Sequence, residues 1–251
     1  MSVVLVGKGD WSKKLEVMIK SSTNLDVIII GARAFLEEEV TGDIYWLTTT
    51  PTNQLRILPR LPVESKVILE KPAFLNLTEL EIIHHEYIQR QKTLFFSLPW
   101  NFSSCLEEIS KVLGGEEIVL IETHRGGPVL RSYMPSYLDW IPHDLGLFSA
   151  LDQHPIPSFE TVEVKGESVN ATGSLSSTRI SMISGYAKER QALWRMTAAN
   201  GKVFDVDFYS QVQKTGEEPL KRMFSRFLAD AYDSSRMFGV WREFFHHFHL
   251  R

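Results

Sequence analysis

Lys71, Asp139 and His143 are the residues of this chain whose types best suit proton transfer. Lys71 stands in the triplet Glu70-Lys71-Pro72, directly after a short apolar run, and Asp139 and His143 follow one another at D-x-x-x-H spacing. A lysine can polarise an oxygen as an ammonium donor or act as a base, and an imidazole exchanges protons near neutral pH. If the fold brings them together, these groups form a proton-handling set.

Each of the three residues also has a structural interpretation. Lys71 can be a solvated residue ahead of a proline turn. Asp139 can be a helix N-cap, because Pro142 is tolerated in the first turn of a helix and Asp139 lies three residues before it. His143 can belong to an amphipathic helix whose apolar face carries Leu145, Leu147 and Phe148. The alternatives stay open at this level.

A glycine-containing turn opens the chain. The apolar run 3–6 leads into Gly7-Lys8-Gly9-Asp10-Trp11-Ser12, and a helical pattern follows. In a strand-turn-helix context such glycines let the backbone approach a pyrophosphate, which the N–H groups of the helix N-terminus then bind. The third small position is Ser12 rather than glycine, and the bland alternative is a tight turn without a ligand.

The second apolar run predicts which dinucleotide would bind. It ends in Gly31-Ala32-Arg33, with no acidic residue for the hydroxyl groups of the adenosine ribose. Arg33 could instead face a 2′-phosphate. The pattern therefore favours NADP over NAD.

The secondary-structure pattern that must position these residues changes at about residue 98. Up to residue 98, short apolar runs alternate with helical patterns, which predicts parallel βαβ units. Strands are expected at 3–6, 26–30, 43–47, 66–69 and 93–97, and helices at 12–19, 53–58 and 76–91. Only about a dozen residues separate the second run from Asp43, so this Rossmann-type sheet of about five strands lacks an outer strand.

Residues 99–251 predict a second, α+β domain with an open, mostly antiparallel sheet. Its expected strands lie close together without regular crossover helices, at 118–123, 161–164, 168–174, 179–184, 193–198 and 203–208. Asn200-Gly201 is typical of a hairpin turn between the last two. A helix is expected at 103–112, and another after Pro219 with Phe224, Phe227 and Leu228 at helical spacing.

Composition excludes several classes of protein. The net charge is -4, so the chain has no basic footprint for nucleic acid or a membrane surface, and a small molecule becomes the expected ligand. No apolar run is long enough to span a bilayer, and the start has no signal-peptide pattern. Cys105 is the only cysteine, which fits the reducing cytoplasm. Adjacent histidines such as His84 and His85 point in different directions on a helix, so we expect no metal site.

These motifs together resemble the Gfo/Idh/MocA oxidoreductases. The likeness rests on the opening glycines, Thr48-Thr49-Thr50-Pro51, Glu70-Lys71-Pro72, the Asp139/His143 spacing and the late hairpin, and it spans most of the chain. Departures are the short segment before Asp43, the absence of a histidine shortly after Pro51, and Asn101 where the family often has an arginine.

The resemblance implies hydride transfer between a nicotinamide, NADP or NAD, and a sugar- or cyclitol-like carbinol. By the same match, Lys71 would hold the substrate oxygen, His143 would exchange its proton and Asp139 would assist, while Pro72 would follow a cis peptide bond. The open sheet would join subunits into a homodimer or homotetramer. The implied cofactor residues are Gly7, Gly9, Asp10, Trp11, Ser12, Arg33, Thr49, Thr50, Pro51, Glu70, Lys71 and Pro72.

A substrate site near the start of the second domain is a further hypothesis. Aromatic faces and an arginine suit polyols, and the candidates are Trp100, Asn101, Arg131 and Tyr137. Packing in a core or interface is the alternative. Two other functions remain open for the whole chain: a ligand-binding or interface protein that kept the fold but lost turnover, and an imine or enoyl-type reductase on the same scaffold.

Overall fold

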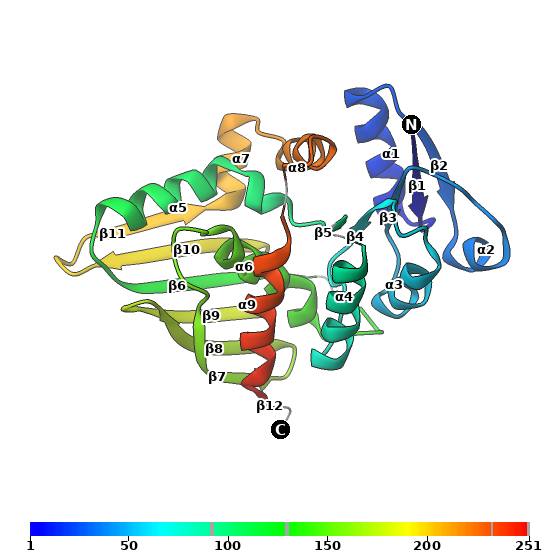
Figure 1. Cartoon of the computed structure of the whole chain (residues 1–251). Helices are drawn as coiled ribbons and strands as arrows, with labels where there is room; N and C mark the ends of the chain where they lie inside the picture. The colour runs from blue at the N-terminus through cyan, green and yellow to red at the C-terminus, as the bar shows by residue number, and fades with distance from the viewer. Residues whose placement is uncertain (91–92, 129–130, 232, 250–251) are drawn as a thin grey trace. The chain divides into compact units, whose positions relative to one another are not determined.

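The computed structural model describes residues 1–90, 93–128, 131–231 and 233–249. The chain divides into two compact units (Figure 1). The first consists of Met1–Ser97 and Phe224–Ser235, and the second of Leu98–Met223 and Arg236–Arg251.

The first unit contains a five-stranded, wholly parallel sheet in the order β2-β1-β3-β4-β5. Its strands are β1 (Ser2–Val6), β2 (Asp26–Ile30), β3 (Ile44–Leu47), β4 (Lys66–Leu69) and β5 (Leu94–Phe96). The helices of the unit are α1 (Asp10–Ser22), α2 (Ala32–Glu37), α3 (Pro51–Ile57), η1 (Leu58–Arg60) and α4 (Leu77–Gln89). The predicted five-stranded Rossmann-type sheet is confirmed.

Burial along the strands explains their order. Every residue of β3 and β5 is buried, as expected of short apolar strands covered on both faces. In β2 exposed and half-buried positions alternate up to Ile30, the only buried residue of the strand, and Ile28 is 42% exposed. β2 is therefore an edge strand, and the short connection to β3 holds only the six-residue helix α2, which the sequence did not predict.

The second unit is built on a seven-stranded mixed sheet in the order β11-β10-β6-β9-β8-β7-β12. Its strands are β6 (Ile118–Gly127), β7 (Ser158–Lys165), β8 (Ser168–Leu175), β9 (Thr178–Tyr186), β10 (Gln191–Ala198), β11 (Val203–Asp207) and β12 (Phe248–His249). Four of the six pairings are antiparallel, and the exceptions are β6 with β9 and β7 with β12. The mostly antiparallel sheet is thus confirmed, including the predicted hairpin, where Gly201 has φ 84°.

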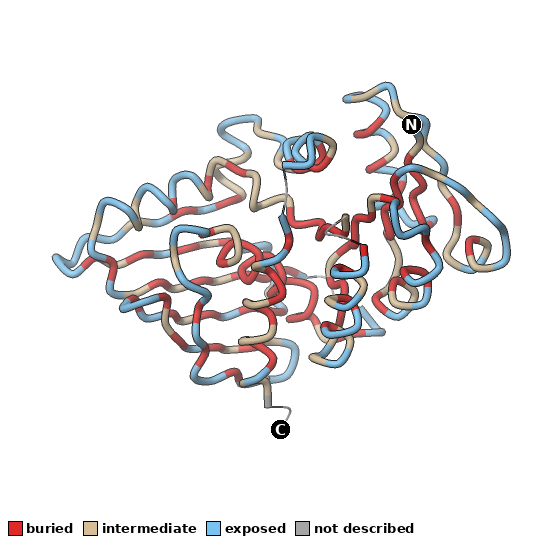
Figure 2. The backbone as a smooth tube through the Cα atoms, in the orientation of Figure 1, coloured by how far each residue is buried: buried red, intermediate tan, exposed pale blue. Residues whose placement is uncertain are grey.

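One face of this sheet is covered. Along β8 and β10 buried residues alternate with more exposed ones (Figure 2). The remaining helices are η2 (Pro99–Phe102), α5 (Ser104–Gly115), α6 (Ser136–Ala150), α7 (Phe208–Thr215), α8 (Pro219–Leu228) and α9 (Ser235–His246). α6 packs on β6 and β9, and α9 packs on β7 through Phe244 and Phe159. The opposite face carries exposed side chains such as Ile183 and Arg195.

The segment Phe224–Ser235 belongs to the first unit, although the sequence places it in the second domain. Phe224 of α8 stacks on Trp46 of β3 with ring centroids 5.6 Å apart, and Phe227 meets Phe95 of β5 edge-on at 4.8 Å. Both phenylalanines are buried. Helical spacing predicts that the two residues share a face, but it does not identify the sheet that this face covers.

Candidate functional site

The glycine turn joins β1 to α1 at the carboxyl edge of the parallel sheet. A Cβ at Gly7 would lie 2.4 Å from the carbonyl oxygen of Thr48, so only glycine fits there. A Cβ at Gly9 would meet no atom within 4 Å, and Gly9, the N-cap of α1, provides no side-chain cap. The N-cap residue therefore leaves the first N–H groups of α1 without a side-chain acceptor, which is the condition under which a helix N-terminus binds an anion such as pyrophosphate.

The buried Ser12 links the start of α1 to the residue after β3. It is fully buried, and its Oγ lies 2.7 Å from Oγ1 of Thr48. A small residue at this third position lets the helix pack closely on the strand, and Thr48 satisfies the extra hydroxyl that serine introduces. Ser12 thus takes the packing role of the missing glycine, with its hydroxyl satisfied by Thr48, a residue of the threonine motif that the sequence did not connect with this turn.

The charges around the turn favour an anion. Asp10 is exposed in the first turn of α1, and Nζ of Lys13 lies 3.3 Å from its carboxylate. Lys14 lies over the ring of Trp11, with Nζ 5.3 Å from the centroid. With Lys8 in the turn itself, lysines outnumber the one carboxylate of this turn, so the local field favours a negatively charged ligand.

Glu70, the first residue after β4, has a buried carboxylate. Its Oε1 accepts a hydrogen bond from Nε1 of Trp46 at 2.9 Å. Burial raises the pKa of the Glu70 carboxyl, and Trp11, Ser97 and Lys71 beside it offset part of that rise. The Glu70 side chain, directly before Lys71, is therefore buried at the carboxyl edge of the sheet and held there by Trp46, rather than solvated.

Lys71 and Pro72 follow in a loop that is tied to the neighbouring strand exit. The Lys71–Pro72 peptide bond is cis, in agreement with the expectation from the family resemblance. Nε2 of Gln54, a buried residue of α3, donates to the carbonyl oxygens of Glu70 at 2.9 Å and Thr49 at 3.1 Å. The sequence did not identify Gln54 as a support, because its two partners lie in different loops.

Thr49, Thr50 and Pro51 lead into α3 at the carboxyl end of β3. Thr49 Oγ1 accepts a hydrogen bond from Asn53 at 3.2 Å, and Pro51 occupies the first turn of the helix. Since β1, β3 and β4 are neighbours in the sheet, the structure brings together three predicted segments at one sheet edge: Gly7–Ser12, Thr49–Pro51 and Glu70–Pro72.

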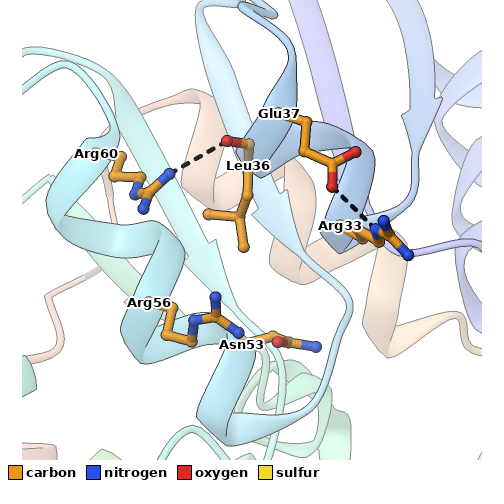
Figure 3. Close-up of a pocket in the computed structure, with 6 residues that line it drawn as sticks. All are labelled: Arg33, Leu36, Glu37, Asn53, Arg56 and Arg60. Carbon is orange, nitrogen blue, oxygen red and sulfur yellow. Dashed lines mark hydrogen bonds and ion pairs between the residues drawn. The ribbon is translucent and has the colours of Figure 1, made fainter.

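Arg33 lies apart from these three segments, one strand further out. It belongs to α2, and its Nε is 2.9 Å from Oε1 of Glu37. Arg33 lines a cavity of about 500 Å³ that also includes Arg56 and Arg60 (Figure 3). The sequence did not single out these two arginines, because they follow β3 rather than β2.

In the second unit, α6 carries Asp139 and His143. The helix begins at Ser136 and has Pro135 as its N-cap, so Asp139 lies within the helix and the N-cap interpretation is wrong. Pro142 is accommodated inside a helix whose residues from Ser136 to Phe148 are all buried. At i, i+4 spacing Asp139 and His143 share one face of α6, and both are buried.

Asp139 has a cationic partner from the preceding loop. Nε of Arg131 lies 3.3 Å from Oδ2 of Asp139, and the same guanidinium donates to the hydroxyl of Tyr133 at 2.6 Å. Arg131 is partly exposed whereas Asp139 is not. The pair therefore joins a buried carboxylate of α6 to a guanidinium that solvent or a ligand can reach.

A fully buried ion pair connects α6 with the sheet. Nε of Arg125 on β6 is 2.8 Å from Oδ1 of Asp144, and Nε1 of Trp194 on β10 donates to the same oxygen at 2.9 Å. Asp144 is fully buried and Arg125 nearly so. Asp144, the residue next to His143, is thus bound to two strands, and these bonds fix the rotation of α6 on the sheet. The sequence indicated this ion pair only by placing a charged residue within an apolar helical run.

The other substrate candidates pack within the second unit. Trp100 meets Phe208 and Tyr209 edge-on at 5.5 and 5.6 Å. Tyr137 is buried, and this burial, followed by the nearby Glu167, raises the pKa of its phenol. Asn101 lies against Gly146 of α6. The surroundings of Trp100 and Tyr137 match the packing alternative for these aromatic residues.

The described residues contain neither a metal-binding cluster nor a membrane-spanning helix. Over residues 1–90, 93–128, 131–231 and 233–249, no group of three or more His, Cys, Asp or Glu side chains is arranged to hold a metal ion. No helix within the same ranges is long and apolar enough to cross a membrane.

Comparison with known proteins relates this fold to dehydrogenases. No family model and no curated protein matches the sequence. Among solved structures, a dehydrogenase from Chromobacterium violaceum superposes with a TM-score of 0.71 at 12% identity, over 97% of this chain and 93% of that one. Scyllo-inositol dehydrogenase from Lactobacillus casei, with bound NAD(H) and scyllo-inositol, gives a TM-score of 0.68 at 11% identity, over 98% and 95%.

A third similar structure is UDP-N-acetylglucosamine 3-dehydrogenase from Acidithiobacillus ferrooxidans, with a TM-score of 0.67 at 14% identity, over 96% of this chain and 94% of that one. These identities are low, so the likeness establishes architecture rather than activity. The parallel sheet and the mixed sheet of this chain agree with that architecture. The chain has the two-domain fold of the Gfo/Idh/MocA-type dehydrogenases.

Proposed function

We propose that the protein is a NAD(P)-dependent oxidoreductase that transfers a hydride between a nicotinamide and a sugar- or cyclitol-like carbinol or carbonyl. The observation that carries the proposal is the open space above Gly9, at the uncapped N-terminus of α1 and at the carboxyl edge of a parallel sheet. That edge is where α/β folds of this type bind dinucleotides. The surplus of lysines around the turn and the small, buried Ser12 fit the same ligand.

The cofactor, NADP or NAD, supplies or accepts the hydride when bound, and the residues of this chain bind, orient and move protons. The N–H groups at the start of α1 would hold its pyrophosphate. In the proposal Lys71, which lies between the buried Glu70 and the cis-proline, donates a hydrogen bond to the substrate oxygen. His143 exchanges the proton of that oxygen, and Asp139 with Arg131 assists at the same face of α6.

The proposal also covers the substrate, the cellular compartment and the contact between subunits. The sugar- or cyclitol-like substrate is a small molecule, for which the partly exposed Arg131 offers hydrogen-bond donors. We further propose a cytoplasmic enzyme, since the lone cysteine is buried and needs no oxidising compartment. The exposed face of the seven-stranded sheet is the surface proposed to join subunits into a dimer or tetramer.

The test has two steps. NADPH and NADH are titrated against the intact protein while nucleotide fluorescence is followed, and a panel of polyols and cyclitols is then screened for turnover. Lys71→Ala is expected to lower turnover by about 10²- to 10⁴-fold, because the substrate oxygen loses its proton donor, and to leave nucleotide affinity largely intact. Lys20→Ala, which removes an exposed lysine from the last turn of α1, is the matched control.

Each outcome separates the candidate functions. If neither nucleotide binds at about 1 mM, the upper end of ordinary KM values, the chain is a fold relative without dehydrogenase activity. If Lys71→Ala turns over normally, the lysine has no part in the chemistry. Turnover of imines or enoyl compounds but not of carbinols would replace the proposed substrate class with the reductase alternative.

A further inference from the structure

We propose that the cavity between α2 and α3 binds the phosphate on the adenosine ribose, so that the protein selects NADP over NAD through three arginines. The inference rests on the proposed function and names the dinucleotide that it uses. Residues from three elements line the cavity of about 500 Å³ (Figure 3): Arg33, Leu36, Glu37, Asn53, Arg56 and Arg60.

The charge of this cavity calls for an anion. It contains three guanidinium groups and one carboxylate, Glu37, which is engaged by Arg33. Arg60 donates to the carbonyl oxygen of Leu36 at 3.2 Å, a neutral partner. Arg56 has no carboxylate within salt-bridge distance among the described residues. A phosphate dianion would offset the uncompensated charge, and guanidinium groups match phosphate geometry with paired hydrogen bonds.

The position of the cavity fits the ribose end of a dinucleotide. α2 follows β2 through Gly31, and the backbone N–H of Gly7 donates to the carbonyl oxygen of Ile30 at 2.7 Å. The side chain of Lys8 passes over Gly31, with Cδ 3.4 Å from the place of a Cβ. The exit of β2 therefore lies directly beside the glycine turn, where the adenosine ribose of a bound dinucleotide is expected.

The type of residue at this exit argues against NAD. A dinucleotide site that prefers NAD places a carboxylate there to accept hydrogen bonds from both ribose hydroxyls. This chain has Gly31, Ala32 and Arg33 instead, and Glu37, the one carboxylate lining the cavity, is bonded to Arg33. A ribose phosphate would meet guanidinium groups there, whereas free hydroxyls would find the one carboxylate already paired with Arg33.

Arg56 and Arg60 reach the cavity because β2 is the edge of the sheet. With no strand outside β2, the short α2 packs beside α3, and arginines that follow β3 face a helix that follows β2. Figure 3 shows the side chains of Leu36 and Arg56 directed into the space between the two helices. Leu36 offers apolar contact and the planar guanidinium of Arg56 offers a stacking surface to an adenine ring, so the cavity suits a phosphorylated adenosine better than a bare phosphate.

The experiment measures the binding of adenosine 2′,5′-bisphosphate and of 5′-AMP to the intact protein by isothermal titration calorimetry. The two probes differ only in the phosphate assigned to the cavity. We expect the bisphosphate to bind at least about tenfold more tightly, the ratio that one charge-assisted hydrogen bond supplies. Arg56→Ala should remove most of this ratio while affecting 5′-AMP less, and Arg33→Ala should act in the same direction.

Controls separate this proposal from general charge effects and from folding. Lys20→Ala also removes one positive charge from the first unit and should leave the affinity ratio of the two probes unchanged. If Lys20→Ala lowers this ratio as much as Arg56→Ala does, the preference reflects net charge, and the assignment of the phosphate to the cavity is overturned. Arg56→Lys keeps the positive charge but loses the paired hydrogen-bond donors of the guanidinium. If this variant still prefers the bisphosphate over 5′-AMP as strongly as wild type does, the claim that a guanidinium is required is overturned. Thermal melting of each variant shows whether it is folded.

The outcomes also distinguish this inference from the proposed function. Equal affinity for the two adenosine probes, with NADH and NADPH both bound, overturns the inference and leaves the dehydrogenase proposal standing. A preference for the bisphosphate without binding of NADH or NADPH supports the phosphate pocket and overturns the dehydrogenase. Competition by inorganic phosphate as strong as by the bisphosphate would reduce the cavity to a simple anion site and overturn the adenosine assignment.

Discussion

At the scale of single residues, the loop before Lys71 is determined by one buried carboxylate. Glu70 is 7% exposed and accepts the indole N–H of Trp46, and Gln54 holds the backbone oxygen of the same residue. Burying the ionised carboxylate costs desolvation free energy, but the hydrogen bonds of Glu70 fix the direction in which the chain leaves the strand. Glu70 is therefore a positioning residue for Lys71 rather than a group that reacts.

We predict that Glu70→Gln removes part of the pH dependence of stability. Because burial raises the pKa of Glu70, the folded protein binds this proton more tightly than the unfolded chain does. Wild-type stability therefore falls as pH rises from about 4.5 through the raised pKa. Glutamine keeps an acceptor for Trp46 and has no charge to desolvate, so the variant gains stability relative to wild type as pH rises.

Urea denaturation at a series of pH values measures this difference in the free energy of unfolding. Glu38→Gln, at an exposed position, serves as the control and should leave the wild-type profile unchanged. Parallel profiles for wild type and Glu70→Gln would show that the carboxyl is not perturbed in the folded protein.

At the scale of elements, α6 decides the geometry of the second unit's candidate residues. Asp139 and His143 share one face because the helix is continuous through Pro142. The adjacent Asp144 is bound by Arg125 and Trp194 from two strands. A buried ion pair of this kind specifies how a helix sits on its sheet, at a desolvation cost that apolar residues would not incur.

We predict that Asp144→Asn destabilises the protein by about 3–5 kcal/mol, because Arg125 keeps its charge in a buried place without the counter-charge. The double variant Arg125→Met/Asp144→Leu should recover most of that loss, since no charge remains buried. Asp205→Asn, which breaks the exposed pair with Arg195, should change stability little. Guanidinium denaturation gives all three values, and an unchanged midpoint for Asp144→Asn would contradict the role given to this pair.

At the scale of the whole molecule, the chain crosses between its two units more than once. It leaves the first unit after Ser97, returns to it at Phe224 and enters the second again at Arg236. Beyond the two phenylalanines, the returning segment contributes Asp233, which accepts a hydrogen bond from Tyr87 of α4 at 2.9 Å. The first unit is thus completed by residues that lie far from it in the sequence.

We predict that Phe227→Ala destabilises the first unit by about 3–5 kcal/mol, the usual cost of removing a buried phenylalanine. The loss should appear as faster hydrogen exchange of the backbone amides of β4 and β5, whose residue Phe95 loses its edge-on partner. Phe204→Ala, at a half-buried position of β11, is the matched control and should leave those amides protected. Unchanged exchange in Phe227→Ala would show that the segment is not part of this core.

The sequence by itself determined the local structure and the loops of the sheet edge. Apolar runs of four or five residues fixed the parallel strands, and glycines with a following helical pattern fixed the first turn, because strands, turns and helix starts depend on neighbours in the chain. The short connection after β2 correctly predicted the missing outer strand. Glu70-Lys71-Pro72 was placed at a strand exit, and its cis bond followed from the resemblance.

Only the tertiary structure decided which distant side chains meet. Helical spacing put Phe224 and Phe227 on one face but could not name the sheet beneath them, and Arg56 joined Arg33 only because α3 packs beside α2. The N-cap interpretation of Asp139 failed because burial holds α6 together through a proline that local rules place in a first turn. Local preferences are properties of a few neighbouring residues, whereas these contacts depend on how whole elements bury their apolar faces.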